Sequence, residues 1–280
     1  MPDIAELLPD YERPPVVETI LGVQFDRLSR LKNAHLGAYW KVLDSAEWPV
    51  VADAGPLPPQ FERFDPTSGW AGAIQLQLTQ DPAYRLQIKN RDGDRMIQVQ
   101  NGRLHFNWLG KSGGPYPRYE RVRSEFALLL EQFKRFLSDE SVGEFRPNQW
   151  EVTYVNDIPQ GTVWSTPADW GFFEPLAAVP TMESVAEGES FGGQWHFVIP
   201  PQRGRLHIDW EHLKSPQGDK EAAEELIRVT LTARGPVDRS DKTSVIEGLE
   251  LGRATIVRSF QALMSEAANR YWGLKNAGNR

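Results

Sequence analysis

The sequence predicts an α+β fold in which duplicated β-α-β(3-4)-α units form an antiparallel sheet with long helices packed on one face. Three observations lead to this prediction. Alternating apolar and polar runs follow one another through tight turns, two longer stretches carry apolar residues at helical spacing, and both halves share a similar element order. We divide the chain into an N-terminal arm (1–14), a first β-α-β4-α repeat (15–145) and a second β-α-β3-α repeat (146–280).

The first repeat opens with a β-branched run at 16–25 that is typical of a strand. The segment 34–43 reads as a short helix, with Asn33 as its candidate cap. Five prolines between 49 and 68 are incompatible with a helix or a central strand. We therefore expect an extended loop at 49–68.

A run of strands follows this loop. Asp92-Gly93 and Asn101-Gly102 are both strong hairpin signals, and they separate segments that alternate between apolar and polar residues. The predicted strands are 73–79, 83–89, 96–100 and 103–108. Apolar residues at helical spacing over 119–137 then predict a long amphipathic helix.

The second repeat has a similar order. We expect a long connection at 159–192 with a short helix from Pro167, and a closing helix at 249–272. The predicted strands are 150–158, 194–200, 205–210 and 225–233. The aromatic residues of the long connection either cap the core or form a partner-binding edge, and they are Trp164, Trp170, Phe172 and Phe173.

A local match supports the duplication. Residues 102–108 read GRLHFNW and residues 204–210 read GRLHIDW. If the two segments are equivalent, Trp108 and Trp210 should occupy matching core positions in the two repeats. The alternative interpretation is a chance similarity between two strands.

Composition restricts the class of protein. Hydrophobic residues make up 40% of the chain and charged residues 25%, which is typical of a globular protein. The absence of cysteine excludes disulfides, thiolate nucleophiles and cysteine-bound metal centres. The N-terminus lacks the apolar run of a signal peptide, and no stretch approaches the ~18 apolar residues of a membrane span. We expect a cytoplasmic protein without a membrane partner.

Three segments carry a resemblance to a known family: PPVVETILGVQF (14–25), QWEVTYVNDIP (149–159) and RSFQALMSEAANRYWG (258–273). The chain resembles an uncharacterised bacterial family of hypothetical proteins that is sporadically distributed across genomes. The resemblance supplies no catalytic residues, and such a distribution implies a defence or mobile-element setting. Separately, the β-α-β4-α order resembles the repeat of the TATA-binding-protein-like fold, in which two copies share a curved sheet with helices on one face.

Strand alternation sorts the side chains onto two faces of the predicted sheet. One face is apolar, and the other, which we call the polar face, carries Gln, Arg, His, Asn and Thr. An ordinary solvated sheet face would give the same alternation, so both interpretations stay open. The candidate binding residues on the polar face are Arg85, Gln87, Lys89, Gln98, Arg103, His105, Arg205, His207 and Asp209.

These features favour a non-enzymatic binding or adaptor protein that presents its polar face, or its aromatic connection, to a macromolecular partner, with a protein as the first expectation. The first alternative is a nucleic-acid binder, although the net charge of −7 opposes polyanion binding at long range. The basic residues of such a binder would be Arg85, Lys89, Arg103 and Arg205.

The second alternative is a small-molecule binder or enzyme with a cavity between sheet and helices. A homo-oligomer is compatible with each of the three hypotheses.

The sequence shows no catalytic or cofactor signature. His207 and His212 lie five residues apart, so a strand turns them to opposite faces and they cannot jointly bind a metal. His207 and Asp209 share a face, but a catalytic set needs a third group. Neither Gly113-Gly114 nor Gly192-Gly193 follows a strand and opens a helix in the pattern that a phosphate loop needs, and both stretches are typical of turns. We expect no cofactor and no metal.

Overall fold

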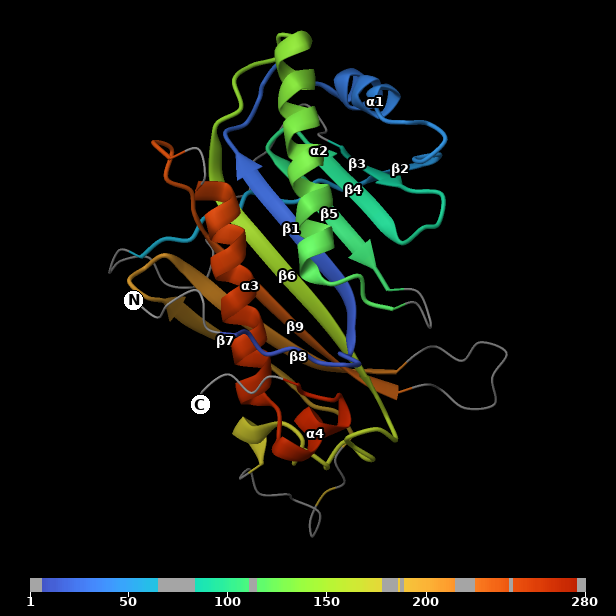
Figure 1. The fold of residues 1–280 in the computed structure, drawn as a ribbon, viewed down its shortest axis with the longest axis vertical. Helices are drawn as coiled ribbons and strands as arrows, with labels where there is room; N and C mark the ends of the chain where they lie inside the picture. The colour runs from blue at the N-terminus through green and yellow to red at the C-terminus, as the bar shows by residue number, and fades with distance from the viewer. Residues whose placement is uncertain are drawn as a thin grey trace.

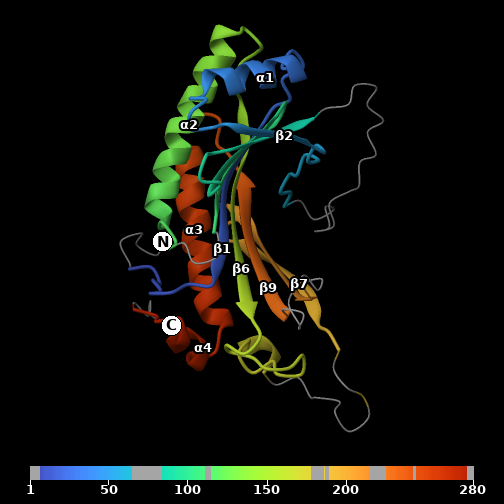
Figure 2. The same ribbon diagram turned by 90° about the vertical axis from the view of Figure 1, so that its right-hand side faces the viewer.

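The computed structural model describes residues 7–64, 84–110, 115–177, 186, 189–214, 225–241 and 244–275. Nine strands of these described residues form one antiparallel sheet, and the long helices cover one of its faces (Figures 1 and 2). The strands are β1 (Val16–Phe25), β2 (Val50–Ala54), β3 (Arg85–Lys89), β4 (Arg95–Gln100), β5 (Arg103–Leu109), β6 (Pro147–Pro159), β7 (Gly192–Ile199), β8 (Gly204–Lys214) and β9 (Glu225–Pro236). The helices are α1 (Asn33–Val42), α2 (Tyr119–Asp139), α3 (Ser244–Leu263) and α4 (Glu266–Tyr271), with a 3-10 turn, η1, at Glu174–Leu176.

The strand order is β2-β3-β4-β5-β1-β6-β9-β8-β7. β1 and β6, the first strands of the two halves, lie side by side at the centre and run antiparallel. β5 flanks β1 and β9 flanks β6, so each half places its first strand inside and its remaining strands outward in reverse chain order. The prediction of an antiparallel sheet with helices on one face is confirmed.

The two matching sequence segments do not occupy corresponding strands. Trp108 lies on β5, which is next to the central pair, whereas Trp210 lies on β8, one strand further out. Both side chains are buried, but the prediction that they hold equivalent positions is wrong. The alternation of polar and apolar residues suits any strand with one face under the helices, so two different strands carry it. The seven-residue match therefore gives no support to a duplication.

Helices α2 and α3 lie on the same face of the sheet (Figure 2). α2 packs on β1 and β5, and α3 packs on β6 and β9. Apolar residues on the two helices are covered by this packing. Val257 is half-buried, and the buried residues are Phe126, Leu130, Phe133, Phe260 and Leu263. No helix among the described residues has both the length and the apolar character that a membrane crossing requires.

Trp150 sets how closely α3 approaches the sheet. Its side chain is buried on β6, and Gly248 and Gly252 lie one helical turn apart on α3 above it. A Cβ atom on Gly248 would lie 2.2 Å from Trp150 Cδ1, and one on Gly252 would lie 2.9 Å from Trp150 Cζ3. The helix can sit on the indole ring because these two positions carry no side chain.

The loop expected at 49–68 contains a short strand, β2. Pro49 lies just before β2, and the next proline follows it at Pro56, so the strand itself has every backbone N–H group. Among the described strands, β2 pairs with β3 alone and lies at an edge of the sheet, where one ladder of hydrogen bonds is enough. The predicted strand at 73–79 lies outside the described residues.

Three helical predictions also change. Asn33 is the first residue of α1, and Lys32 occupies the capping position. The described part of the connection 159–192 contains η1 instead of a helix from Pro167. The closing helix expected at 249–272 is two helices, because Ser265 donates its backbone N–H to Phe172 O (2.8 Å) and its hydroxyl caps α4.

The close packing on Trp150 makes a prediction about Gly248→Ala. Replacing a helical glycine by alanine normally stabilises by up to about 1 kcal/mol. At Gly248, we expect the unfolding free energy to fall by roughly 1–3 kcal/mol because the methyl group meets the indole ring. Urea denaturation measures this change.

Gly37→Ala provides the matched control. Gly37 lies in α1, and a Cβ atom there would meet nothing within 4 Å. This variant should gain stability. A Gly248→Ala variant that is as stable as Gly37→Ala would contradict the packing described for α3.

Candidate functional site

The polar face lies on the side of the sheet opposite α2 and α3. Cross-strand register lines up one residue from each strand between β3 and β8 in a single row, which we call the central row. In spatial order the central row is Gln87, Gln98, His105, Gly22, Glu151, Arg234 and Arg205. Four residues of this row were predicted as binding residues from the sequence: Gln87, Gln98, His105 and Arg205. Glu151 and Arg234 lie in the same row but were not predicted.

Gly22 allows His105 to reach across β1. A Cβ atom on Gly22 would lie 2.5 Å from His105 Cδ2, so only glycine leaves room for the ring. His105 Nε2 lies 3.4 Å from Glu151 Oε1, and Arg234 Nη1 lies 3.4 Å from Glu151 Oε2. Burial acts to raise the pKa of Glu151, but His105 and Arg234 outweigh it and the pKa is lowered. Glu151 is therefore ionised, and it joins the two halves of the row.

Residues 57–64, which we call the crossing segment, run over the polar face outside regular secondary structure. Their contacts extend from Gln100 on β4 to Arg205 on β8. Five strand spacings separate β4 from β8, which is about 24 Å at ~4.8 Å per spacing. Leu57 and Arg63 are six residue steps apart, and an extended chain covers this interval in ~20–22 Å at ~3.3–3.6 Å per step, so the crossing segment is close to fully extended and the long side chains of Gln100 and Arg205 cover the rest.

Glutamine side chains of three strands hold the backbone of the crossing segment. Gln100 on β4 accepts from Leu57 N (2.9 Å) and donates to Leu57 O (2.8 Å). Gln24 on β1 accepts from the backbone N–H of residue 60 (2.8 Å), and Gln149 on β6 accepts from the backbone N–H of residue 62 (3.2 Å). These bonds recognise main chain and not side chains.

Two arginines add to this backbone recognition. Arg103 Nη2 donates to Pro58 O (3.3 Å), and Arg205 Nη2 donates to Arg63 O (3.1 Å). The guanidinium carbon of Arg205 also lies 5.0 Å from the centre of the Phe64 ring. A cation over an aromatic face at this distance is attracted to it.

Glu62 is the anchor of the crossing segment. Its Oε1 lies 2.7 Å from His207 Nε2 and accepts from Arg234 Nε (3.2 Å), while Oε2 accepts from Arg205 Nη1. We call Arg205, His207 and Arg234 the carboxylate site. Only 6% of the Glu62 side chain is exposed. Burial acts to raise the pKa of Glu62, but the hydrogen bond from His207 and the two arginines outweigh it, and the pKa is lowered.

The polar face is therefore not an open platform at its centre. Gln98, Arg103 and His105 are only 5–7% exposed. The expectation that these three side chains are presented to solvent is wrong. Arginines on a sheet face need hydrogen-bond acceptors when water is excluded, and this chain supplies them from Glu151 and from the crossing segment.

The remaining predicted residues lie around this centre. Gln87 donates to Gln98 Oε1 (3.2 Å). Lys89 is exposed at the end of β3, and Arg85 is half-buried at its start, where burial lowers the pKa of its guanidinium group. Asp209 is half-buried on β8, opposite Thr230 on β9. Of the four basic residues that the nucleic-acid alternative would use, Arg103 and Arg205 are hydrogen-bonded within the protein. Arg85 and Lys89 are the two that remain accessible to a phosphate group.

Sequence reasoning missed five residues of the site. Gln24 and Glu151 lie on strands that the sequence predicts, whereas Gln149 and Arg234 lie one residue beyond the predicted strands 150–158 and 225–233 and belong to β6 and β9 in the structure. The same alternation, continued by one residue at these two ends, would have placed all four on the polar face. Glu62 lies in a proline-rich stretch without periodicity, so no local signal connects it to the sheet.

The aromatic residues of the connection 159–192 serve the core. Trp164, Phe172 and Phe173 are buried. Trp164 Nε1 donates to Ile158 O (2.8 Å), and the Phe173 ring is stacked 5.8 Å from that of Trp195. The interpretation of these residues as a cap on the core is the one that the packing supports.

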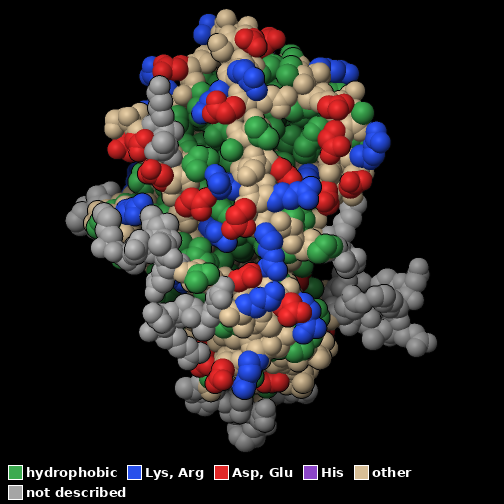
Figure 3. All heavy atoms as spheres, in the orientation of Figure 1, with side chains coloured by type: hydrophobic (Ala, Val, Ile, Leu, Met, Phe, Trp, Pro, Cys, Tyr) green, Lys and Arg blue, Asp and Glu red, His purple; other side chains and the backbone are tan. Residues whose placement is uncertain are grey.

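On the opposite, helix-covered face, the described residues form no extended surface of a single charge. Basic and acidic side chains alternate over α2, α3 and their surroundings (Figure 3). Surface pairs such as Arg123 with Glu250 (2.9 Å) account for part of this mixture. A face of mixed charge offers no extended attraction to a polyanion.

Comparison of the chain with protein families, with curated proteins and with solved structures found no match. The resemblance to a sporadic bacterial family stays an expectation. Any functional conclusion therefore rests on the residues and contacts described above.

Burial of His105 predicts a pH-dependent stability. Desolvation lowers the pKa of His105 from 6.5 to about 4, so the unfolded chain binds a proton at this residue before the folded chain does. The unfolding free energy should therefore decrease as the pH falls from about 6.5 to about 4, by up to about 3 kcal/mol from this residue. Urea denaturation at several pH values measures the slope.

His105→Gln should show a smaller slope in the same interval. A residual slope of the same sign is expected, because burial also lowers the pKa of His196. An unchanged slope in His105→Gln would show that His105 is not buried in its neutral form.

Proposed function

We propose that this protein is a non-enzymatic binding protein whose polar face binds an extended segment of a protein partner. One observation carries the proposal. The polar face already holds an extended peptide, the crossing segment, through side chains that bond its backbone and through a site that binds one carboxylate. The chain's own segment occupies the position that the partner would take.

Recognition of the backbone supports a peptide ligand. Gln24, Gln100 and Gln149 each bond to main-chain atoms, and an amide side chain can accept and donate at once, as Gln100 does with Leu57. Such bonds accept any sequence that can lie extended. Pro58 and Pro59 of the crossing segment, together with Pro56 just before it, favour that conformation before binding.

The carboxylate site supplies the selectivity. Arg205 and Arg234 approach one Glu62 carboxylate together with His207, and charge-assisted bonds of this kind are stronger than neutral ones. The Phe64 ring packs against the same Arg205. A partner segment should therefore be extended, with a glutamate followed two residues later by an aromatic side chain.

The crossing segment competes with a partner. Because it belongs to the same chain, its effective concentration at the polar face is on the order of millimolar. A partner has to displace it, and its apparent affinity is reduced by the fraction of molecules in which the face is occupied. Phe61 points away from the polar face and is exposed. A partner therefore has to break only the contacts that the crossing segment makes with the polar face.

We place this activity in the setting that the sequence suggests. The proposal includes a cytoplasmic protein of the bacterial family described above, with a role in defence or in mobile elements. The shared strand order of the two halves supports an origin by duplication of a β-α-β(3-4)-α unit, although the resemblance between residues 102–108 and 204–210 does not.

The test uses a labelled peptide that spans residues 55–64 and the full chain with Glu62→Gln. The substitution weakens the hold of the chain's own segment, so this variant should bind the peptide more tightly than the wild-type chain does. A peptide with glutamine at position 62 should bind roughly 10- to 150-fold more weakly, since it lacks the charge-assisted bonds. Fluorescence anisotropy measures both affinities.

Glu131→Gln is the matched control, because Glu131 is an exposed glutamate on α2 that pairs with Lys134. This variant should bind the peptide as the wild-type chain does. If a folded Glu62→Gln chain does not bind the native peptide, the proposal is wrong. Salt-sensitive binding of an oligonucleotide in its place would favour the nucleic-acid alternative.

A further inference from the structure

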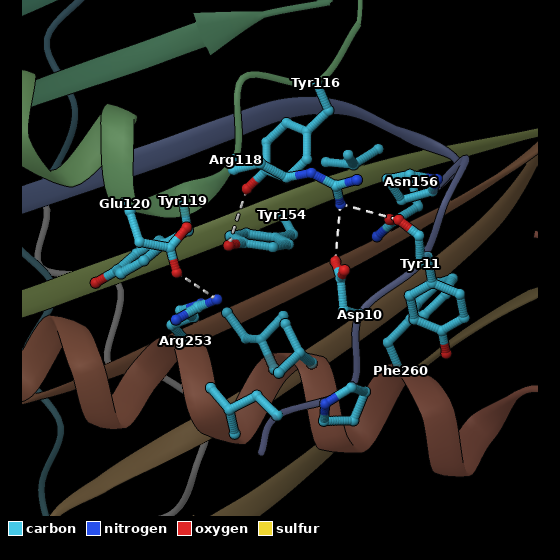
Figure 4. A pocket seen from close by; sticks show the side chains of 16 residues that line it. Asp10, Tyr11, Tyr116, Arg118, Tyr119, Glu120, Tyr154, Asn156, Arg253 and Phe260 are labelled. Atoms are coloured by element: carbon cyan, nitrogen blue, oxygen red, sulfur yellow. Dashed lines mark hydrogen bonds and ion pairs between the residues drawn. The ribbon is translucent and has the colours of Figure 1, made fainter. Parts of the chain in front are cut away.

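A second site lies on the other side of the sheet, between α2 and α3. It is a pocket of about 280 Å³ that opens over β6 (Figure 4). Its walls come from the first turn of α2, one face of α3, the strand β6 and the residues that precede β1. We call it the tyrosine pocket after Tyr11, Tyr116, Tyr119 and Tyr154, which line it.

The walls of the tyrosine pocket are mainly aromatic and aliphatic. Ile256, Val257 and Phe260 project from α3, and Val16 closes the pocket at the start of β1. Tyr11 meets Phe260 edge to face, with ring centres 5.8 Å apart. Aromatic walls of this kind bind flat apolar molecules through stacking and edge contacts.

The charges at the rim are balanced within the protein. Arg118 Nη1 donates to Asp10 Oδ1 (2.8 Å) and to Tyr11 O (2.9 Å). Arg253 Nη2 lies 2.8 Å from Glu120 Oε1, and its guanidinium carbon lies 4.6 Å from the centre of the Tyr119 ring. Figure 4 shows both arginines directed along the rim toward these acids. A charged ligand would have to break one of these pairs or enter without a counterion.

The hydroxyl groups of Tyr116 and Tyr154 are uncharged hydrogen-bonding groups in the pocket. The hydroxyl of Tyr116 donates to that of Tyr154 at 3.2 Å, and the Tyr154 ring faces the interior of the pocket (Figure 4). Burial raises the pKa of both phenols, so they remain protonated at neutral pH and act as hydrogen-bonding groups without charge.

The N-terminal wall of the pocket is fixed in place. Tyr11 donates its hydroxyl to Asn269 Oδ1 (2.6 Å), and its backbone bridges to Leu274. Backbone N–H groups of Glu12 and Arg13 donate to Gly273 O (2.9 Å) and Trp272 O (3.0 Å). A wall held by these bonds keeps the pocket open before a ligand arrives, which lowers the entropic cost of binding.

We infer that the tyrosine pocket is a binding site for a small, uncharged aromatic molecule that carries one hydrogen-bonding group for the Tyr116–Tyr154 hydroxyl pair. The volume of about 280 Å³ lies just below the range for ligand pockets, about 300–1,000 Å³, so a one- or two-ring molecule fits and a drug-sized one does not. This site is independent of the proposed peptide binding, since it lies on the opposite face of the sheet.

The test uses phenol and indole as neutral probes and benzoate as an anionic probe, with the full chain. Ligand-observed NMR titration should show saturable binding of phenol and indole, and benzoate should bind at least about tenfold more weakly, because its charge is not compensated. Tyr154→Phe should weaken phenol binding about three- to tenfold through the lost hydroxyl contact.

Val257→Trp fills the pocket from α3 at a half-buried position, so the fold should tolerate it. This variant should lose the binding of both neutral probes. Leu128→Trp, at a position on α2 that is 74% exposed, adds the same indole outside the pocket and should bind like the wild type. Equal binding of benzoate and phenol, or full binding of phenol by a folded Val257→Trp chain, would overturn the inference.

Discussion

The side chains of Arg103, Arg205 and Arg234 lie against the polar face of the sheet, and their positive charge has to be compensated because little water reaches them. Glu151 compensates part of it from within the sheet, and Glu62 compensates the rest from the crossing segment. The polar face therefore requires an acidic group from outside the strands. This requirement explains why a proline-rich stretch without secondary structure is held in one place, and it is the reason that we propose an acidic peptide as the ligand.

The sequence predicted the elements whose pattern is local. Alternation identified most strands and sorted their two faces correctly, and helical spacing identified α2 and the core side of α3. Residues whose role depends on distant partners were not predictable in this way. Nothing near Glu62 indicates that Arg205 and Arg234 will surround it, and β2 pairs with β3, which lies much further along the chain. The match between residues 102–108 and 204–210 shows the opposite error, since a good strand pattern recurs on strands that are not equivalent.

β6 connects the two proposed sites. Its odd-numbered residues Glu151 and Thr153 face the polar side, while Trp150 and Tyr154 face the helices. Each face of one central strand thus contributes to a different binding chemistry, charged on one side and neutral on the other. Because the backbone of β6 is paired on both sides along its length, the side chains at both sites are held by a rigid element, as precise binding sites need.

The central position of β1 has a consequence for how the protein is made. β1 leaves the ribosome before the other eight described strands, yet its neighbours β5 and β6 come much later in the chain. Until β6 emerges, the backbone N–H and C=O groups on one side of β1 have no partner strand, although β1 is an apolar strand at the centre of the sheet. An exposed strand edge of this kind can pair with a wrong segment or with another chain. The first half of the chain can therefore collapse during synthesis, but the free edge of β1 is paired only when β6 has been made. Truncated chains that end before β6 should for this reason aggregate.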